Sequence, residues 1–142
     1  MSTTLFMATR TKAYVDSGAF IAFLDQSDSH HRLFSDLFAS DTQPWTSSAV
    51  IIETHGWFLR RFDAARALQF LNFIDDLKPL KIIGIEAADI KQARGYLIRF
   101  KDQRLTVVDA IGLHLMDRYK ISLCWGTDRH LGLTGRRLAI HR

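Results

Sequence analysis

Cysteine is almost absent from this sequence of 142 residues, which contains only Cys124. A single cysteine excludes a disulfide framework and a cysteine-rich zinc site, and it fits a reducing compartment. The first ten residues, MSTTLFMATR, lack the basic head and long apolar stretch of a secretion signal or a membrane span. We therefore expect a cytoplasmic protein that does not associate with membranes.

Several familiar motifs are missing as well. The sequence contains no Walker A motif, no dinucleotide-binding fingerprint and no nucleophile elbow. The turn at 132–135, which is followed by two arginines, lacks the flanking helices of a KH-type GxxG loop. His30 and His31 are adjacent and would diverge by about 100° on a helix, so they make a poor ligand pair.

The composition is that of an ordinary folded domain. Apolar residues make up 47% of the chain, enough for a buried core, and the length suits a single domain over residues 1–142. The net charge of +4 is unevenly distributed: residues 94–142 carry ten Lys or Arg and four Asp, whereas residues 1–93 carry nine cations and eleven acids. A basic C-terminal third favours a polyanionic partner, although a solubilising surface has the same composition.

Short apolar segments alternate with amphipathic ones along the chain. The strands are expected at 13–15, 80–85, 121–125 and 138–140, with a further short strand or loop at Pro44 and Trp45. The helices are expected to begin after capping residues such as Thr46 or Ser47, Asp63 and Thr106, and to cover 17–24, 33–38, 48–62, 63–78, 86–100 and 107–119. Strands separated by helices predict an α/β fold whose parallel sheet is covered on both faces.

Two acids occupy unusual places on the predicted helices. Glu53 shares the apolar face of Val50 and Trp57, and Asp109 shares the face of Leu113. An exposed amphipathic helix would carry such acids on its opposite side. Both acids are therefore candidates for a site.

Two further acids follow predicted strands. Asp16 comes directly after the strand at 13–15, and Asp128 follows the strand at 121–125 after two residues. Open α/β sheets build their sites at the carboxyl ends of their strands. If the helices that carry Glu53 and Asp109 lean over that edge, all four acids converge.

Convergence of four carboxylates requires compensation. Two carboxylates about 4 Å apart repel by roughly 4 kcal/mol at an effective dielectric constant near 20, and a marginally stable domain does not tolerate several such pairs. Either some of the acids stay protonated, or a hard divalent cation lies among them, for which oxygen ligands favour Mg²⁺ or Mn²⁺ over zinc. Such an ion can activate water and neutralise charge at phosphorus, so the pattern favours phosphodiester hydrolysis.

Each acid also has a purely structural interpretation. Asp16 and Asp128 suit helix caps, and Glu53 or Asp109 suits an internal ion pair. The candidate partners for such a pair are Arg60, Arg99 and Arg118. The joint arrangement, rather than any single acid, favours a functional site.

The residues around these acids resemble the PIN-domain ribonucleases, most closely the VapC-type toxins of bacterial toxin–antitoxin pairs. The likeness is carried by AYVDSGAFIAFLD, SSAVIIETHGWFLRRF, RLTVVDAIGLHLMDRYKI and SLCWGTDRHLGLTGRRL, whose order and spacing cover essentially the whole chain. The resemblance implies a three-layer α/β/α fold with a mostly parallel central sheet. It also implies an endoribonuclease that depends on Mg²⁺ or Mn²⁺.

The resemblance assigns the residues of the site. The family's acidic quartet, which binds the metal and does the catalysis, falls on Asp16, Glu53, Asp109 and Asp128. The adjacent Thr127 would orient an attacking water or a carboxylate oxygen. One departure is Leu131, where similar sequences often have Phe; it affects packing near the site and removes no ligand.

Several cationic residues are candidates for contacts with an RNA substrate. They are Arg60, Arg61, Arg104 and Arg129, each of which suits a solvated surface equally well. His130 follows Asp128 closely and is placed to touch the substrate, whereas His114 lies in an apolar helix and is more simply a hydrogen-bonded core residue.

The resemblance also implies partners. Such toxins cut structured RNA, often tRNA or ribosomal RNA, and many form homodimers. A small antitoxin holds them inactive, with its tail over the acidic site and often with an Arg on the carboxylates. The apolar group of Leu33, Phe34, Leu37 and Phe38 is a candidate dimer or antitoxin surface.

Three alternatives differ in function. The chain could be a PIN-like module that binds RNA without cutting it, which the loss of an acid would favour, and none is lost. It could be a nuclease of RNA processing rather than a toxin. A phosphotransfer domain with Asp16 as nucleophile would need a second Asp two residues later, where the sequence has Gly18.

Overall fold

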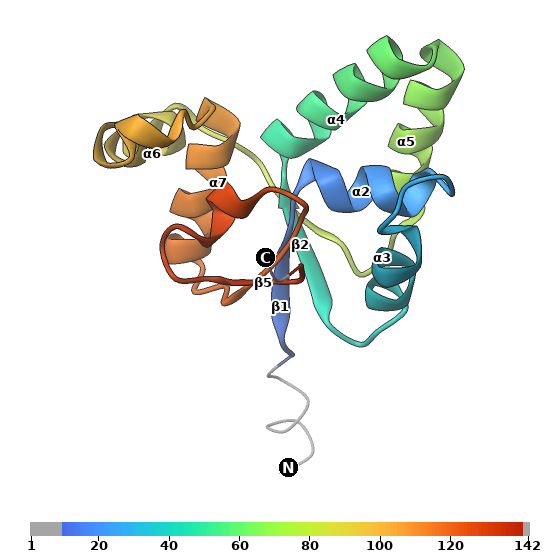
Figure 1. Cartoon of the computed structure of the whole chain (residues 1–142), viewed down its shortest axis with the longest axis horizontal. Coiled ribbons are helices and arrows are strands. Elements are labelled where there is room, and N and C mark those ends of the chain that lie inside the picture. The colour runs from blue at the N-terminus through green and yellow to red at the C-terminus, as the bar shows by residue number, and fades with distance from the viewer. Residues whose placement is uncertain (1–9, 141–142) are drawn as a thin grey trace.

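The computed structural model describes residues 10–140 (Figure 1). Residues 1–9, in which the sequence predicts neither a signal nor a span, lie outside the described residues, as do 141–142. No helix in the described part is both long and apolar enough to cross a membrane. In chain order the elements are β1 (Lys12–Val15), α2 (Ser17–Leu24), α3 (His31–Phe38), β2 (Gln43–Ser47), α4 (Ser48–Arg61), α5 (Ala64–Asp76), β3 (Lys81–Ile83), α6 (Ala87–Arg99), η1 (Lys101–Gln103), α7 (Val107–Arg118), β4 (Leu123–Trp125), η2 (Arg129–Gly132) and β5 (Arg137–Leu138).

The five strands form one parallel sheet in the order β3-β2-β1-β4-β5. The central strand is β1, in which Ala13 pairs with Pro44 of β2 and with Leu123 of β4. Residues 13–15 are fully buried, as expected of a strand covered on both faces. Because the strands are parallel, their carboxyl ends share one edge, where the Asp16 N–H donates to the Trp125 carbonyl at 2.8 Å.

Three helices begin where the sequence predicts a cap. The Ser47 hydroxyl accepts the Val50 N–H at 3.2 Å at the start of α4, and the Asp63 carboxylate accepts the Arg66 N–H at 2.8 Å at the start of α5. The Thr106 hydroxyl accepts the Asp109 N–H at 3.1 Å at the start of α7. Each side chain satisfies a backbone donor that the first helical turn leaves free.

Some of the predicted strand boundaries are wrong. The last strand is Arg137–Leu138 rather than 138–140, and the strands predicted at 80–85 and 121–125 are shorter. The Arg137 N–H donates to the Ser122 carbonyl at 2.9 Å and the Ala139 N–H to that of Cys124 at 3.0 Å. Pairing with β4 therefore sets the register of β5, and the apolar run at 138–140 does not.

The helices form a layer on each side of the sheet, so the predicted three-layer arrangement is confirmed. Figure 1 shows α6 and α7 on one side and α2, α3, α4 and α5 on the other. On the latter side the aromatic rings of Phe58 and Phe70 stack with centroids 5.7 Å apart, and Phe20 meets Phe70 edge-on at 5.6 Å. Burying each of these rings stabilises the fold by roughly 1.5–3 kcal/mol.

The apolar group predicted as an exposed surface on α3 is largely internal. Phe34 is fully buried, and Leu37 and Phe38 pack against the core, where Phe38 stacks on Phe20 with centroids 5.8 Å apart. Only Leu33 of this group is exposed. The 3.6-residue spacing identified the apolar face of α3 correctly, but α2 and the sheet cover most of it.

Candidate active site

Asp16 lies at the carboxyl end of the central strand and directly precedes α2. The residue is only 6% exposed. The pKa of this carboxyl is raised to about 7, mainly by burial and also by the negative charges of Glu53, Asp109 and Asp128, while a hydrogen bond from the Ser17 backbone opposes the shift. Gly126, directly after β4, packs closely against Asp16: a Cβ on Gly126 would lie 3.1 Å from the Cβ of Asp16. The two strand ends therefore meet at this carboxylate.

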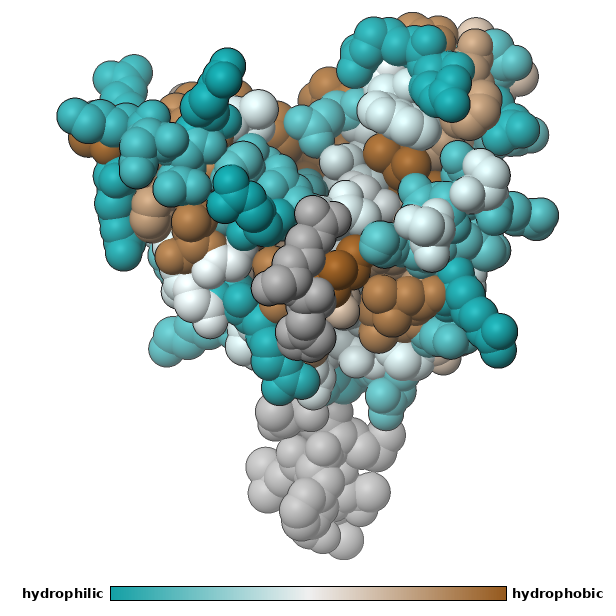
Figure 2. All heavy atoms as spheres, in the orientation of Figure 1, coloured by the Kyte–Doolittle hydropathy of each residue, from teal (hydrophilic) through white to brown (hydrophobic). Residues whose placement is uncertain are grey.

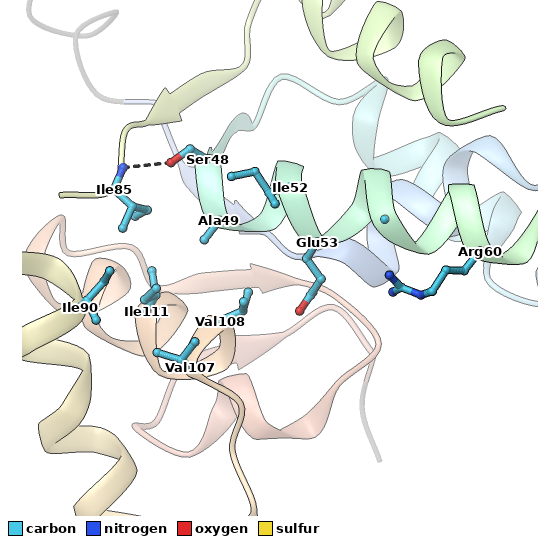
Figure 3. Close-up of a pocket in the computed structure, with 11 residues that line it drawn as sticks. Ser48, Ala49, Ile52, Glu53, Arg60, Ile85, Ile90, Val107, Val108 and Ile111 are labelled. Carbon is cyan, nitrogen blue, oxygen red and sulfur yellow. Dashed lines mark hydrogen bonds between the residues drawn. The ribbon is translucent and has the colours of Figure 1, made fainter. Parts of the chain in front are cut away.

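Glu53 reaches the same region from α4. In Figure 3 its side chain points away from the helix toward Val108 of α7. Burial raises the pKa of Glu53, and the charges of Asp109 and Asp128 add to the increase. The Ser17 side chain and the positive charge of Arg60 oppose it. Glu53 is thus electrostatically coupled to the acids that follow the strands.

Asp109 lies in the first turn of α7 and takes part in a capping box. One of its carboxylate oxygens, Oδ2, accepts the Thr106 N–H at 3.1 Å, while its own N–H donates to the Thr106 hydroxyl. Burial raises the pKa of Asp109, hydrogen bonds from Thr106 lower it, and the charge of Asp128 raises it. The cap fixes the position of this acid, which stays buried beside another carboxylate.

Asp128 follows β4 and caps η2. Its Oδ1 accepts the N–H of His130 at 2.9 Å, and its side chain is 37% exposed. The imidazole of His130 folds back over the acids, with Nδ1 3.0 Å from Asp128 Oδ1 and 3.7 Å from Asp109 Oδ2. One candidate ligand atom from each of these three residues lies within 4.8 Å of the other two. The sequence indicated that His130 is near Asp128 but not that it contacts Asp109.

The four acids form no ion pair with a lysine or arginine in the part of the chain that the structure describes. Among residues 10–140, no Lys or Arg forms an ion pair with Asp16, Glu53, Asp109 or Asp128. Of the arginines considered as internal partners, Arg118 instead binds Asp89 at 3.2 Å. Such a concentration of carboxylate oxygens can hold a divalent cation.

The predicted substrate-binding arginines occupy different parts of the surface. Arg60 is exposed and lines the same pocket as Glu53, and its guanidinium extends toward that side in Figure 3. Arg129 is exposed and directly follows Asp128. Arg61 lies at the end of α4 over the ring of Phe62, 5.5 Å from its centroid. Arg104 is exposed in the turn that precedes α7.

A groove lies beside Glu53, between α4 and the helices α6 and α7. It has a volume of about 640 Å³ and is lined mostly by apolar side chains, with Glu53 and Arg60 as its charged members. Two of its lining residues are unusually exposed for their type, Ile52 at 72% and Ile90 at 50%. Figure 2 shows the surface hollowed between the arm of α4 and α5 and the arm of α6 and α7, with hydrophilic residues at the outer ends of both arms.

Residues 13–134 match the PIN domain family model, and the chain therefore belongs to the PIN domain family. The resemblance seen in the sequence is confirmed at this level. No curated protein matches the chain significantly.

Solved structures with the same fold include several VapC toxins. VapC20 of Mycobacterium tuberculosis, a sarcin–ricin loop cleaving toxin, superposes with a TM-score of 0.80 at 22% identity over 87% of this chain and 95% of its own. DNA-bound VapBC of Salmonella typhimurium superposes with a TM-score of 0.63 at 16% identity, over 92% of this chain and 97% of its own. A toxin–antitoxin complex of Klebsiella pneumoniae superposes with a TM-score of 0.60 at 16% identity, over 89% of this chain and 94% of its own. At these identities the likeness establishes the shared fold.

Proposed function

We propose that this chain, as a single domain over residues 1–142, is a cytoplasmic metal-dependent endoribonuclease and the toxin of a toxin–antitoxin pair. The observation that carries the proposal is the meeting of four carboxylates at one edge of the sheet. They come from β1, α4, α7 and the end of β4, and they have no lysine or arginine counter-ion among residues 10–140. Membership of the PIN domain family supports the same function.

The residues at this edge fit a divalent metal ion. Burial and mutual repulsion raise the pKa of Asp16, Glu53 and Asp109, so these carboxylates are destabilised in their charged form until a cation joins them. Nδ1 of His130 is buried beside two of the acids and has no hydrogen-bond partner. A set of oxygen donors is the environment that Mg²⁺ and Mn²⁺ prefer.

The chemistry divides between the ion and the side chains around it. When bound, a divalent ion supplies positive charge to the phosphate and lowers the pKa of a water molecule. Asp16, Glu53 and Asp109 hold and position that ion. Asp128 completes the set of metal ligands and, with the adjacent Thr127, orients the attacking water. Four exposed arginines are the proposed contacts of the flanking phosphates: Arg60, Arg61, Arg104 and Arg129.

RNA is the substrate that the charge distribution supports. The chain has a net charge of +4, and its basic C-terminal third includes Arg129 beside the acids. VapC20, which shares the fold, is described as cleaving the sarcin–ricin loop, and a structured RNA is the corresponding expectation for this chain. A PIN-like module that binds RNA without cleaving it, or a processing nuclease without toxicity, is the alternative.

The apolar groove supports a small antitoxin as the partner. A helix with an apolar face would cover Ile52 and Ile90 and place a cationic residue near Glu53, which forms no ion pair with a lysine or arginine among residues 10–140. Structures of the same fold have been determined in complexes of toxin and antitoxin. A homodimer is the assembly that we propose for the free toxin.

Cleavage of a structured RNA by the purified chain tests the proposal. We expect cleavage with Mg²⁺ or Mn²⁺ and none after chelation by EDTA. Asp16→Asn should lose cleavage by at least about 100-fold, because it removes a charged ligand while keeping the shape of the side chain. Asp102→Asn is the matched control, since Asp102 is exposed in η1, and it should cleave like the wild type. Equal cleavage by Asp16→Asn and the wild type, in preparations free of other nucleases, would contradict the assignment.

A further inference from the structure

His130 stands apart from the acids as a nitrogen donor at an otherwise oxygen-only site. It belongs to η2, which Asp128 caps by accepting the His130 N–H at 2.9 Å. This turn brings the ring back over the site, so the side chain is only 20% exposed. Its position is therefore set by the same short segment that positions Asp128.

Nδ1 of His130 points at carboxylates without forming a hydrogen bond. It lies 3.0 Å from Asp128 Oδ1, yet it is buried and has no hydrogen-bond partner. A buried polar atom left in this state destabilises the fold, because it has lost its hydrogen bonds to water and gained none in the protein. Two other buried polar atoms among residues 10–140 also lack a hydrogen-bond partner, Thr134 Oγ1 and Arg136 Nε. Neither residue belongs to the cluster of candidate metal ligands.

The spacing of the three donors suits a shared ion. Ligands at about 2.1 Å from one octahedral ion lie about 3 Å apart when adjacent and about 4.2 Å apart when opposite. Nδ1 is 3.0 Å from Asp128 Oδ1 and 3.7 Å from Asp109 Oδ2, and all three atoms lie within 4.8 Å of one another. One ion can therefore contact all three after small side-chain movements.

We propose that Nδ1 of His130 is a direct ligand of the metal ion, beside Asp109 and Asp128, and that it makes the site prefer Mn²⁺ to Mg²⁺. The proposal rests on the metal-dependent function proposed above, and it gives His130 a role other than contact with the substrate. Mg²⁺ is bound by oxygen ligands and keeps much of its water, whereas first-row transition ions accept an imidazole among carboxylates. A single nitrogen ligand at this position therefore shifts the selectivity of the site from Mg²⁺ toward Mn²⁺.

Binding of Mn²⁺ to the full chain, without substrate, tests this directly. We expect pulsed electron paramagnetic resonance of bound Mn²⁺ to show modulation from a coordinated ¹⁴N nucleus, and this signal to vanish in His130→Asn and His130→Ala. The affinity for Mn²⁺ should fall at least about 10-fold in both variants. His130→Asn places an amide oxygen near the position of Nδ1, so its affinity for Mg²⁺, measured by competition, should change less than about 3-fold. His55→Ala removes a histidine outside the cluster and should keep the ¹⁴N signal.

The outcomes separate this proposal from the proposed function. If wild-type protein binds Mn²⁺ without ¹⁴N modulation, or if His130→Asn keeps that modulation, His130 is not a ligand, although the carboxylate site stands. An equal loss of affinity for both ions in His130→Asn would overturn the selectivity. If the folded wild-type chain binds neither ion, the metal-dependent function itself fails, and this inference fails with it.

Discussion

Gly18 of α2 lies against Thr127, which follows β4, with no room between them for a side chain on Gly18. A Cβ on Gly18 would lie 2.9 Å from the backbone nitrogen of Thr127, closer than side chains tolerate. Gly18 is two residues after Asp16, and Thr127 directly precedes Asp128. This contact therefore sets the distance between two acids of the site, and it requires a residue without a side chain.

Gly18→Ala should weaken both the fold and the site. The added methyl group forces Thr127 away, so we expect a loss of roughly 1–3 kcal/mol in the free energy of unfolding, measured with urea, and at least about 10-fold slower RNA cleavage. Gly95→Ala is the control, because no atom lies within 4 Å of a Cβ at that exposed position of α6. It should raise stability by up to about 1 kcal/mol and leave cleavage unchanged. Wild-type behaviour of Gly18→Ala would show that the contact relaxes without consequence.

A second buried acid, Asp89, joins α6 to α7. Its Oδ1 lies 2.9 Å from His114 Nε2 and 3.2 Å from Arg118 Nη1, and its Oδ2 accepts the Glu86 N–H at 2.9 Å. The hydrogen bond from the Glu86 backbone, followed by His114 and Arg118, lowers the pKa of Asp89. Since α7 carries Asp109, this ion-pair network supports the helix that positions part of the site.

Asp89→Asn should destabilise the fold by about 1–3 kcal/mol at pH 7, because it removes the charge that these partners bind. The lowered pKa means that the charged form stabilises the native state at neutral pH and that this contribution is lost as the pH falls below about 4. The difference between wild type and variant in urea unfolding should therefore shrink under acid conditions. Asp36→Asn, at an exposed position of α3, should change stability by less than about 0.5 kcal/mol at either pH. A constant difference across this range would contradict the charged role of Asp89.

Local chemistry explains which parts of this structure the sequence predicted. Ser47, Asp63 and Thr106 each satisfy backbone donors within three residues, so their helix starts were readable from the sequence and are confirmed. The β5 register depends on the Ser122 and Cys124 carbonyls of another strand, which no local pattern encodes. The edge strand was misplaced for that reason.

Tertiary contacts account for the rest. His114 was predicted to be hydrogen-bonded, and it is, but its partner Asp89 lies 25 residues away on another helix and was missed. The contact of His130 with Asp109 was missed because it depends on the turn of η2; an Asp-x-His spacing after a strand is the signal that would have suggested it. Phe34 was a candidate member of an exposed dimer or antitoxin surface, but packing against its neighbours buries it.

Ile90→Glu should separate inhibition from cleavage. Ile90 is a half-exposed lining residue of the apolar groove on α6, so a charge there should weaken binding of the antitoxin at least about 10-fold while RNA cleavage persists. The dissociation constant for the proposed antitoxin is the measurement. Ile98→Glu lies on the same helix, is 67% exposed and does not line the groove, so it should bind like the wild type. Equal weakening by both variants would place the partner elsewhere on α6.

The pKa of Asp16 predicts how stability depends on pH in the absence of metal. The native carboxyl has a pKa of about 7 against an ordinary value of 3.8, so the native state holds this proton more tightly than the unfolded state does. The free energy of unfolding should therefore fall as the pH rises from about 4 to 7, by up to roughly 4 kcal/mol, and level off above that. Asp16→Asn cannot ionise, and it should be more stable than wild type at pH 8 in EDTA, with the difference vanishing toward pH 4.

Binding of a metal ion should make the wild type more stable than Asp16→Asn at pH 8. The ion binds the deprotonated carboxylate, so its effect on the melting temperature should be larger at pH 8 than at pH 6 for the wild type. Asp16→Asn lacks the charged ligand and should gain much less at either pH, whereas the exposed Asp102→Asn should follow the wild type throughout. Melting curves recorded at both pH values with EDTA or Mn²⁺ measure all of these differences. If Mn²⁺ stabilises Asp16→Asn as much as the wild type, the ion is held without Asp16, and the carboxylate at the end of β1 has another purpose.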